Sequence, residues 1–184
     1  MPAHQTMIAG LIRVSWDTLQ DERGFFKHSY QAREVEEVLG RPLRMQQGNH
    51  SRSRGGVLRG FHAEPWDKFI YVPRGRALCV VADIRPDSAT FGQTESYMLG
   101  DAPGVFDRIF VARCLANAFY TFEETDYLND VSEPFDPANR GGVHWRDSTL
   151  AVDWPSDDPI LSAGDLTLPT LRDLYPDHPR FSGV

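Results

Sequence analysis

The sequence predicts an all-β fold, an antiparallel jelly roll with one short helix near the N-terminus and helical turns near the C-terminus. Short runs rich in Val, Ile, Phe, Tyr and Trp recur along the chain, and clusters of Gly, Pro, Asp and Asn separate them. Strands that alternate with turns at intervals of roughly ten residues are typical of sandwiches and barrels. Long amphipathic repeats, which would indicate helices, are nearly absent. The length of 184 residues suits a single domain, residues 1–184, with one core.

Strands are expected where apolar, β-branched and aromatic residues cluster between turn signals. In chain order they cover residues 8–14, 25–30, 44–49, 57–62, 68–72, 77–84, 93–99, 105–112, 117–122, 143–145 and 150–154. Pro73 and Gly75 lie between two of these runs and predict a tight turn. We therefore expect 68–72 and 77–84 to pair as a hairpin.

Two segments have helical spacing. Val35 and Leu39 lie four positions apart in an acidic segment, and Gly40 follows where a helix would stop. This pattern predicts a short helix over 31–39. The tail after Ser156 is rich in Pro and Asp, and its leucines are spaced for one or two helical turns against the sheet.

Charge and composition exclude several functions. The formal net charge of −7 argues against general nucleic-acid binding, which needs a basic surface. No stretch approaches the roughly 20 apolar residues of a membrane span, and the first residues lack the basic-then-apolar order of a secretion signal. We therefore expect a cytoplasmic protein that contacts neither nucleic acid nor membrane. Cys79 and Cys114 both lie in apolar surroundings, which predicts buried free thiols.

The basic residues are concentrated in one part of the chain. Of the 19 Lys and Arg residues 17 are Arg, and five of these fall between positions 41 and 59. Arginine offers a planar fork of donors that matches phosphate and carboxylate, so this concentration indicates a site for one small anion. The alternative is a solvated, arginine-rich surface loop, because exposed charges contribute little on their own.

The segment from Gln47 to His62 is the densest candidate for a site. Gln47, Asn49 and Ser51 share one face if this segment is a strand, and a polar face of this kind predicts a polar cavity. His62 is a candidate general base because an unperturbed imidazole is largely neutral at cellular pH; the alternative is a structural histidine at a strand end. The residues alone do not identify the carboxylate that would orient it.

Lys68 is one of two lysines and begins an apolar strand. A buried ammonium there needs an anionic partner, unless the side chain extends to solvent. A metal site is disfavoured, because His62-Ala63-Glu64 supplies one His-x-Glu pair and the next histidine is His144. The sequence also contains no glycine-rich phosphate loop, nucleophile elbow or Cys-x-x-Cys pair. We therefore expect no metal site, and no P-loop, serine-hydrolase or thioredoxin-like function.

Several motifs together resemble the dTDP-4-dehydrorhamnose 3,5-epimerase family, sugar-nucleotide epimerases with a cupin-like jelly-roll fold. Residues 47–62 match its pattern Gln-x-Asn-x-Ser-x-Ser-x-x-Gly-Val-Leu-Arg-Gly-x-His, which is the most specific piece. Residues 21–26 resemble Asp-x-Arg-Gly-x-Phe, and residues 161–165 are similar to the closing Leu-Ser-x-x-Asp. Further similarity over 83–92 and 145–155 extends the resemblance over nearly the whole chain.

The resemblance implies a cofactor-independent isomerase in deoxysugar biosynthesis. Its reaction is epimerisation at C3, C5 or both of a dTDP-4-keto-6-deoxyhexose, through proton abstraction next to the C4 ketone. The resemblance implies His62 as the base, Asp165 as its orienting partner, and Lys68 as the cation near the enolate oxygen. It implies that the residues gripping the nucleotide diphosphate are Arg23, Phe26, Gln47, Asn49 and Arg59. It also implies a homodimer whose N-terminal strands cross to the partner.

The chain departs from the family pattern at three positions near the site. Asn117 replaces a histidine of the family's Ala-His-Gly-Phe segment, Glu64 replaces a glutamine, and Asn129 stands where the family carries its proton-donating tyrosine. Asn117 and Asn129 remain candidates for substrate binding. An amide holds no acidic proton, so Tyr127, two residues earlier on the same strand face, is the expected acid. The alternatives are inversion of a single carbon, protonation by water, a ketoisomerase on the same substrate class, or a sugar-nucleotide-binding homologue with impaired turnover.

Overall fold

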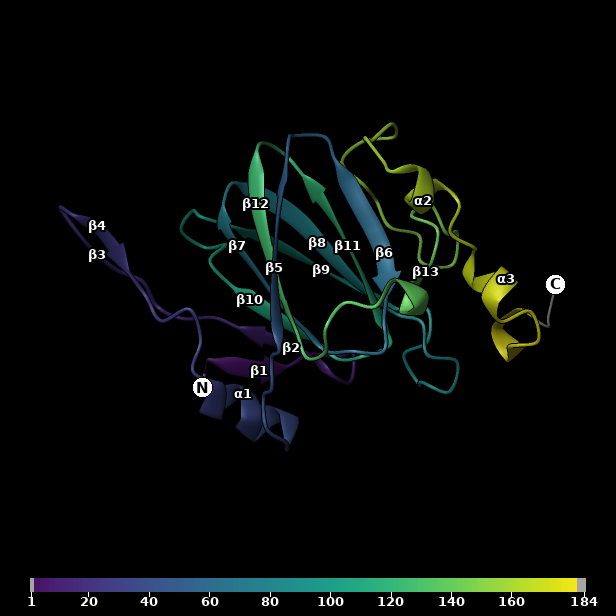
Figure 1. The fold of residues 1–184 in the computed structure, drawn as a ribbon, viewed down its shortest axis with the longest axis horizontal. Helices are drawn as coiled ribbons and strands as arrows, with labels where there is room; N and C mark the ends of the chain where they lie inside the picture. Colours follow the sequence, from purple (N-terminus) through teal and green to yellow (C-terminus); the bar gives the residue numbers. More distant parts are fainter. Residues whose placement is uncertain (1, 182–184) are drawn as a thin grey trace.

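The computed structural model of the chain describes residues 2–181, and this part folds into two antiparallel β-sheets that pack face to face (Figure 1). The first sheet has the spatial order β1 (Ala3–Gln5), β2 (Leu11–Val14), β10 (Arg108–Val111), β7 (Lys68–Arg74), β12 (Thr125–Val131) and β5 (Gln47–Ser53). The second has the order β13 (Gly141–Gly142), β6 (Leu58–Ala63), β11 (Leu115–Thr121), β8 (Arg76–Asp83) and β9 (Thr94–Gly100). Neighbouring strands are mostly distant in sequence, as in a jelly roll. The predicted antiparallel all-β class is confirmed.

The main core lies between the two sheets because side chains alternate across each strand. Ile70 and Val72 of β7 belong to one buried cluster with Val81 of β8. The outer face of the first sheet is covered by α1 (Ala32–Leu39), which buries Val35 there. Each such aliphatic side chain contributes about 1.5–3 kcal/mol when fully buried.

The helical segments agree with the sequence prediction. α1 ends at Gly40, whose φ of 68° is left-handed and whose N–H donates to the carbonyl O of Glu36 at 2.8 Å. The tail forms α2 (Ala163–Leu166) and α3 (Leu171–Leu174), and α3 packs on the outer face of the second sheet. The 3-10 turns of the described chain are η1 (Pro137–Asn139) and η2 (Pro179–Phe181). None of the helices between residues 2 and 181 is long and apolar enough to cross a membrane.

The predicted hairpin of 68–72 with 77–84 is wrong. β7 pairs with β10 and β12 in the first sheet, whereas β8 pairs with β11 and β9 in the second. The turn at Gly75 therefore carries the chain from one sheet to the other. Gly75 has a φ of 80°, and a Cβ there would lie 2.5 Å from the carbonyl O of Glu124, so this crossing requires glycine.

Other strand predictions also differ from the structure. The predicted strands do not include β12, which lines the site described below, or the short strands β1 and β3 (Leu19–Asp21). Residues 143–145 and 150–154 form no strand. The Asp147 carboxylate accepts the backbone N–H groups of Thr149 and Leu150 at 2.8 and 3.0 Å. Val143 exchanges two backbone hydrogen bonds with Phe61 of β6, at 3.1 and 3.2 Å, and the turn at Asp147 ends the pairing before a longer strand can form.

The two cysteines have different surroundings. Cys79 is buried between the sheets, whereas Cys114 is exposed in the turn between β10 and β11, where its φ is 65°. Both thiols are free. The expectation of two buried thiols is therefore wrong for Cys114, because its larger apolar neighbours Val111 and Leu115 belong to the flanking strands and not to the turn.

Candidate active site

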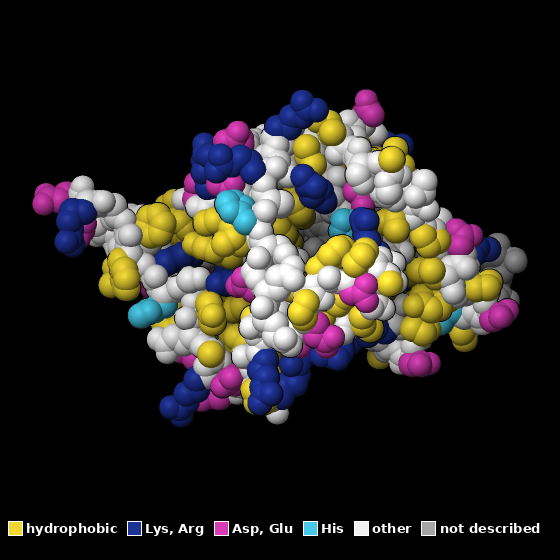
Figure 2. Space-filling model, in the orientation of Figure 1, with side chains coloured by type: hydrophobic (Ala, Val, Ile, Leu, Met, Phe, Trp, Pro, Cys, Tyr) yellow, Lys and Arg dark blue, Asp and Glu magenta, His cyan; other side chains and the backbone are white. Residues whose placement is uncertain are grey.

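A polar cavity of about 160 Å³ opens between the sheets, where β5, β7 and β12 face β6 and β11. Figure 2 shows the surface hollowed between the positions that β5 and β6 occupy in Figure 1. All but one of the lining residues are polar: Asn49, His50, Ser51, Arg59, His62, Glu64, Lys68, Asn117, Phe119, Tyr127 and Asn129. Convergent polar groups of this kind indicate a site for a polar small molecule.

The polar face predicted for Gln47, Asn49 and Ser51 is present on β5, where these side chains are partly buried and those between them are exposed. Asn49 and Ser51 line the cavity. Gln47 lies one step further along: its Nε2 donates to Asn49 Oδ1 at 2.6 Å, and its Oε1 accepts from the N–H of Phe135 at 3.1 Å. Gln47 therefore holds Asn49 in place and does not itself line the cavity.

Arg59 and His62 both line the cavity, although simple alternation along β6 would place them on opposite faces. A β-bulge changes the register of β6 against β11 between these two residues. Within it, Gly60 has a φ of 115°, and a Cβ there would lie 2.6 Å from the carbonyl O of Asn117. A glycine is thus required for the two side chains to meet at one cavity.

His62 lies against a buried carboxylate. Its Nε2 is 2.6 Å from Asp165 Oδ1, and the Asp165 side chain is 5% exposed. Ser162, the N-cap of α2, donates from Oγ to Asp165 Oδ2 at 2.9 Å. Burial raises the pKa of Asp165, but the hydrogen bonds with His62 and Ser162 outweigh it, so this pKa lies below its usual value. The ionised carboxylate favours a proton on Nε2 and leaves the Nδ1 lone pair to accept another.

The ammonium of Lys68 is buried at the cavity and surrounded by acceptors. Its Nζ donates to the carbonyl O of His62 at 3.0 Å and to Asn117 Oδ1 at 2.6 Å. It also forms an ion pair with Glu64. Burial lowers the pKa of Lys68, and the charge of Glu64 opposes that shift. Glu64 is thus the anionic partner that a buried ammonium needs.

Tyr127 and Asn129 lie on the same face of β12 and both line the cavity. The Tyr127 hydroxyl accepts a hydrogen bond from Asn117 Nδ2 at 3.2 Å. Its ring stacks on Phe119 with the centroids 3.9 Å apart, and burial raises the pKa of the phenol. Asn129 Oδ1 is buried and has no hydrogen-bond partner among the described residues, so it can accept from a ligand.

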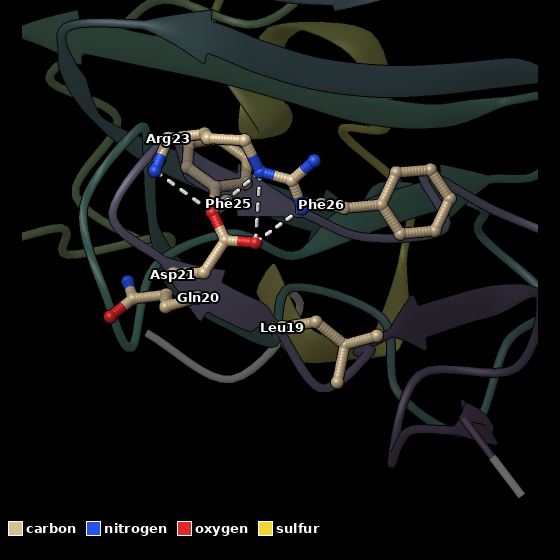
Figure 3. Close-up of a pocket in the computed structure, with 7 residues that line it drawn as sticks. Leu19, Gln20, Asp21, Arg23, Phe25 and Phe26 are labelled. Carbon is tan, nitrogen blue, oxygen red and sulfur yellow. Dashed lines mark hydrogen bonds and ion pairs between the residues drawn. The ribbon is translucent and has the colours of Figure 1, made fainter.

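Arg23 and Phe26 lie outside this cavity. They belong to the hairpin of β3 with β4 (Gly24–Phe26), which projects away from both sheets and lines a pocket of its own of about 550 Å³ (Figures 1 and 3). Arg23 Nε donates to Asp21 Oδ2 at 3.1 Å, while the Phe26 ring points away from this pair and is 63% exposed. Within one chain, the structure does not bring these two residues to the other candidates.

Three lining residues were not assigned to the site from the sequence: His50, Glu64 and Phe119. Glu64 carried a signal, because a buried Lys68 requires a nearby anion. His50 is held at the rim by Asp126, whose Oδ1 lies 3.1 Å from its Nε2. Phe119 is apolar like many core residues, so no sequence signal marks it.

The described part of the chain contains no group of three His, Cys, Asp or Glu residues placed to hold a metal ion. The carboxylates at the cavity are engaged by other side chains, Asp165 by His62 and Ser162, and Glu64 by Lys68. The arrangement offers three groups that act on protons and charge: an imidazole oriented by a carboxylate, a buried ammonium and a phenol.

Comparison with known proteins assigns the chain to a family. The family model described as dTDP-4-dehydrorhamnose 3,5-epimerase matches residues 5–173. The chain belongs to this family. It is 32% identical over 173 residues to the dTDP-4-dehydrorhamnose 3,5-epimerase of Salmonella typhimurium, an alignment that covers 91% of this chain and 93% of the relative. It is 34% identical over 163 residues to the dTDP-4-dehydrorhamnose 3-epimerase of Streptomyces niveus, which covers 86% of this chain and 78% of the relative.

A solved structure of the family shows the same fold. The 4-keto-6-deoxy sugar epimerase from the novobiocin biosynthetic gene cluster of Streptomyces spheroides superposes with a TM-score of 0.90 at 31% identity. The superposition covers 95% of this chain and 89% of that one. The similarity in sequence and in structure therefore spans nearly the whole chain, and the relatives include both a 3,5-epimerase and a 3-epimerase by name.

Proposed function

We propose that this chain is a cytoplasmic epimerase of deoxysugar biosynthesis, which inverts C3, C5 or both of a dTDP-4-keto-6-deoxyhexose without metal or organic cofactor. The observation that carries the proposal is the pair of His62 and Asp165 at a cavity that also contains Lys68 and Tyr127. Relatives named as 3,5-epimerase and as 3-epimerase support the substrate class and leave the choice of carbon to experiment.

In the proposed reaction His62 removes the proton from a carbon next to the C4 ketone. Nδ1 is the accepting atom, because Nε2 faces Asp165 at 2.6 Å. The carboxylate stabilises the imidazolium that forms. A positioned base of this kind contributes about 10²- to 10⁴-fold to the rate. The electron pair released from the C–H bond moves to the C4 oxygen and gives an enolate.

Lys68 supplies positive charge near the enolate, but its surroundings limit this role. Its three N–H bonds are matched by three protein acceptors, His62 O, Asn117 Oδ1 and Glu64. Direct donation to the substrate oxygen therefore requires one of these bonds to be exchanged. Glu64 also offsets part of the positive field, where the family pattern has a neutral glutamine. This observation favours a second candidate function, a sugar-nucleotide-binding homologue with slow turnover.

Tyr127 is the proposed acid that returns a proton to the opposite face of the carbon. Its pKa is raised by burial, so the phenol is protonated at neutral pH. Asn129, Asn49 and Arg59 line the same cavity and are proposed to bind the sugar nucleotide. Tyr127→Phe should therefore lower inversion by about 10²-fold, the scale of a lost general acid. Tyr97→Phe is the matched control, because that hydroxyl binds Glu95 on β9, away from the cavity.

Incubation with dTDP-4-keto-6-deoxyglucose in D₂O, followed by NMR, tests the proposed function. We expect deuterium at C3 or C5 with the C4 ketone retained, whereas a moved carbonyl would identify a ketoisomerase. His62→Ala should lose this exchange and keep binding of the nucleotide sugar, and the exposed His4→Ala should retain both. Binding by the unaltered protein with no exchange at all would instead identify the binding homologue.

We further propose that the protein is a homodimer in which the β3–β4 hairpin serves the partner's cavity. The hairpin projects from the sheets (Figure 1) and exposes Leu19 and Phe26 at 70% and 63%. Mixing Arg23→Ala with His62→Ala subunits after unfolding and refolding tests this. A hairpin acting across a two-fold interface restores about a quarter of the activity, because heterodimers carry one intact site. A hairpin acting within its own chain restores none.

A further inference from the structure

The charge of Lys68 fixes the orientation of the Asn117 side chain. A lysine ammonium carries only donors, so the Asn117 atom that lies 2.6 Å from Nζ is the amide oxygen. The opposite assignment would place two donors against each other inside the protein. The ordinary ambiguity between the oxygen and nitrogen of an amide is therefore resolved here by a neighbouring charge.

The orientation of Asn117 in turn sets the direction of the Tyr127 hydroxyl. With Oδ1 on the ammonium, Nδ2 faces Tyr127 Oη at 3.2 Å and must donate to it. The hydroxyl is thus an acceptor in this contact, and its own hydrogen points elsewhere. Within residues 2–181 the phenol makes no second hydrogen bond, and stacking on Phe119 at an interplanar angle of 10° holds the ring. Tyr127 is one of the residues that line the cavity.

We propose that Asn117 is a positioning residue for proton return: it holds Tyr127 so that the phenolic hydrogen faces the cavity, and it stabilises the phenolate formed when that hydrogen leaves. The inference rests on the proposed function. The family pattern has a histidine where this chain has Asn117 and a tyrosine where it has Asn129, so the contact between Asn117 and Tyr127 belongs to this chain.

The proton transfer balances without another reactant. The O–H bond of Tyr127 breaks, the enolate carbon gains a C–H bond, and the C4 carbonyl re-forms from the enolate oxygen. The phenolate keeps the O–H electron pair and accepts from Asn117 Nδ2, an amide polarised by Lys68 on its other side. Solvent then returns a proton to the phenolate and takes one from the imidazolium of His62.

Asn117→Asp tests this arrangement with a side chain of nearly the same shape. One carboxylate oxygen still accepts from Lys68, but the other now accepts from Tyr127 and turns its hydrogen away from the cavity. The readout is the ratio of inverted product to deuterated substrate of retained configuration, for dTDP-4-keto-6-deoxyglucose in D₂O. Both products share the deprotonation step, so this ratio isolates proton return from any effect of the added charge on enolate formation.

We expect Asn117→Asp to lower the ratio by about 10²-fold, the scale of a lost general acid. Tyr127→Phe should lower it as much, and the double variant no further, because both changes remove one function. Asn117→Ala, which removes the donor without adding charge, should lower the ratio in the same direction. It covers the case in which Asn117→Asp fails to fold.

An unchanged ratio in the folded Asn117 variants overturns the inference, and so does a double variant whose loss is the product of the two single losses. These results differ from those that overturn the proposed function. If the unaltered protein shows neither deuterium exchange nor inversion, the epimerase reaction itself is absent and the role of Asn117 is refuted with it.

Discussion

Replacing Asp165 by Asn isolates what the carboxylate contributes to proton abstraction by His62. The new side chain keeps its size and its place beside Ser162 in α2. It removes the negative charge opposite the imidazolium, at a site where Nε2 and Oδ1 are 2.6 Å apart and the carboxylate is 5% exposed. For charge centres about 4 Å apart and an effective dielectric constant of about 20, this charge is worth about 4 kcal/mol. The corresponding loss in rate is about 10³-fold.

The assay is the rate of deuterium incorporation from D₂O into dTDP-4-keto-6-deoxyglucose. We expect the loss of about 10³-fold with Asp165→Asn and none with Asp158→Asn, whose side chain is exposed. Adding Asp165→Asn to His62→Ala should cause no further loss, because the carboxylate acts through the imidazole. A loss below about tenfold, or a double variant slower than His62→Ala alone, would refute the reasoning.

Three further substitutions test other parts of the structure. Glu64→Gln leaves the buried ammonium of Lys68 without its anion, so the free energy of unfolding at pH 7 should fall by about 3 kcal/mol. The pKa of Lys68 is already lowered by burial, so this loss should shrink as the pH rises towards the unfolded pKa of about 10.4. Equal losses by urea denaturation at pH 7 and pH 9 would contradict this. Burial raises the pKa of Asp83, but its hydrogen bonds outweigh burial and hold the pKa at about 2. The contribution of the Asp83 carboxylate to the free energy of unfolding is therefore complete above the unfolded pKa of about 3.9, and it is lost as the pH falls through about 2. Asp83→Asn should cost about 2 kcal/mol at pH 7 and little near pH 2, and a loss independent of pH would count against it. Gly60→Ala places a Cβ 2.6 Å from a carbonyl O of β11 at a φ of 115°, so thermal unfolding should show a loss of about 3 kcal/mol. Gly104→Ala is the control for backbone strain alone, because Gly104 has a φ of 86° and a Cβ there would meet no atom within 4 Å. An equal loss of stability in Gly104→Ala would show that the clash at Gly60 contributes nothing.

Local patterns in the sequence predict the fold class and most of the strands, because alternation and turn residues act over a few positions. They do not predict which strands become neighbours. The turn at Gly75 has the residues of a hairpin, yet β7 and β8 enter different sheets. β12 escapes prediction because Asp126, Asn129 and Asp130 interrupt its apolar run. A strand that turns polar side chains into a cavity lacks the alternation by which a half-buried strand is recognised.

The site is predictable where one motif holds the residues together. The spacing between Gln47 and His62 is enough to indicate a polar cavity and a base. The meeting of Arg59 with His62 is not predictable from alternation, because it depends on a bulge in β6. The hydrogen-bonded chain from Lys68 through Asn117 to Tyr127 joins β7, β11 and β12. Contacts of this kind arise from the packing of two sheets and have no counterpart in residue spacing.

The groups proposed to give and take protons are carried by opposite layers of the sandwich, His62 by β6 and Tyr127 by β12. The span that a substrate carbon must fit is therefore set by the thickness of the apolar filling between those layers. Interiors packed at crystal-like density transmit an added methylene as a displacement. An enlarged side chain at Val81, within that filling, would widen the reaction gap without touching the substrate. We therefore expect the rate of the proposed reaction to depend on the volume of the side chains packed between the two sheets.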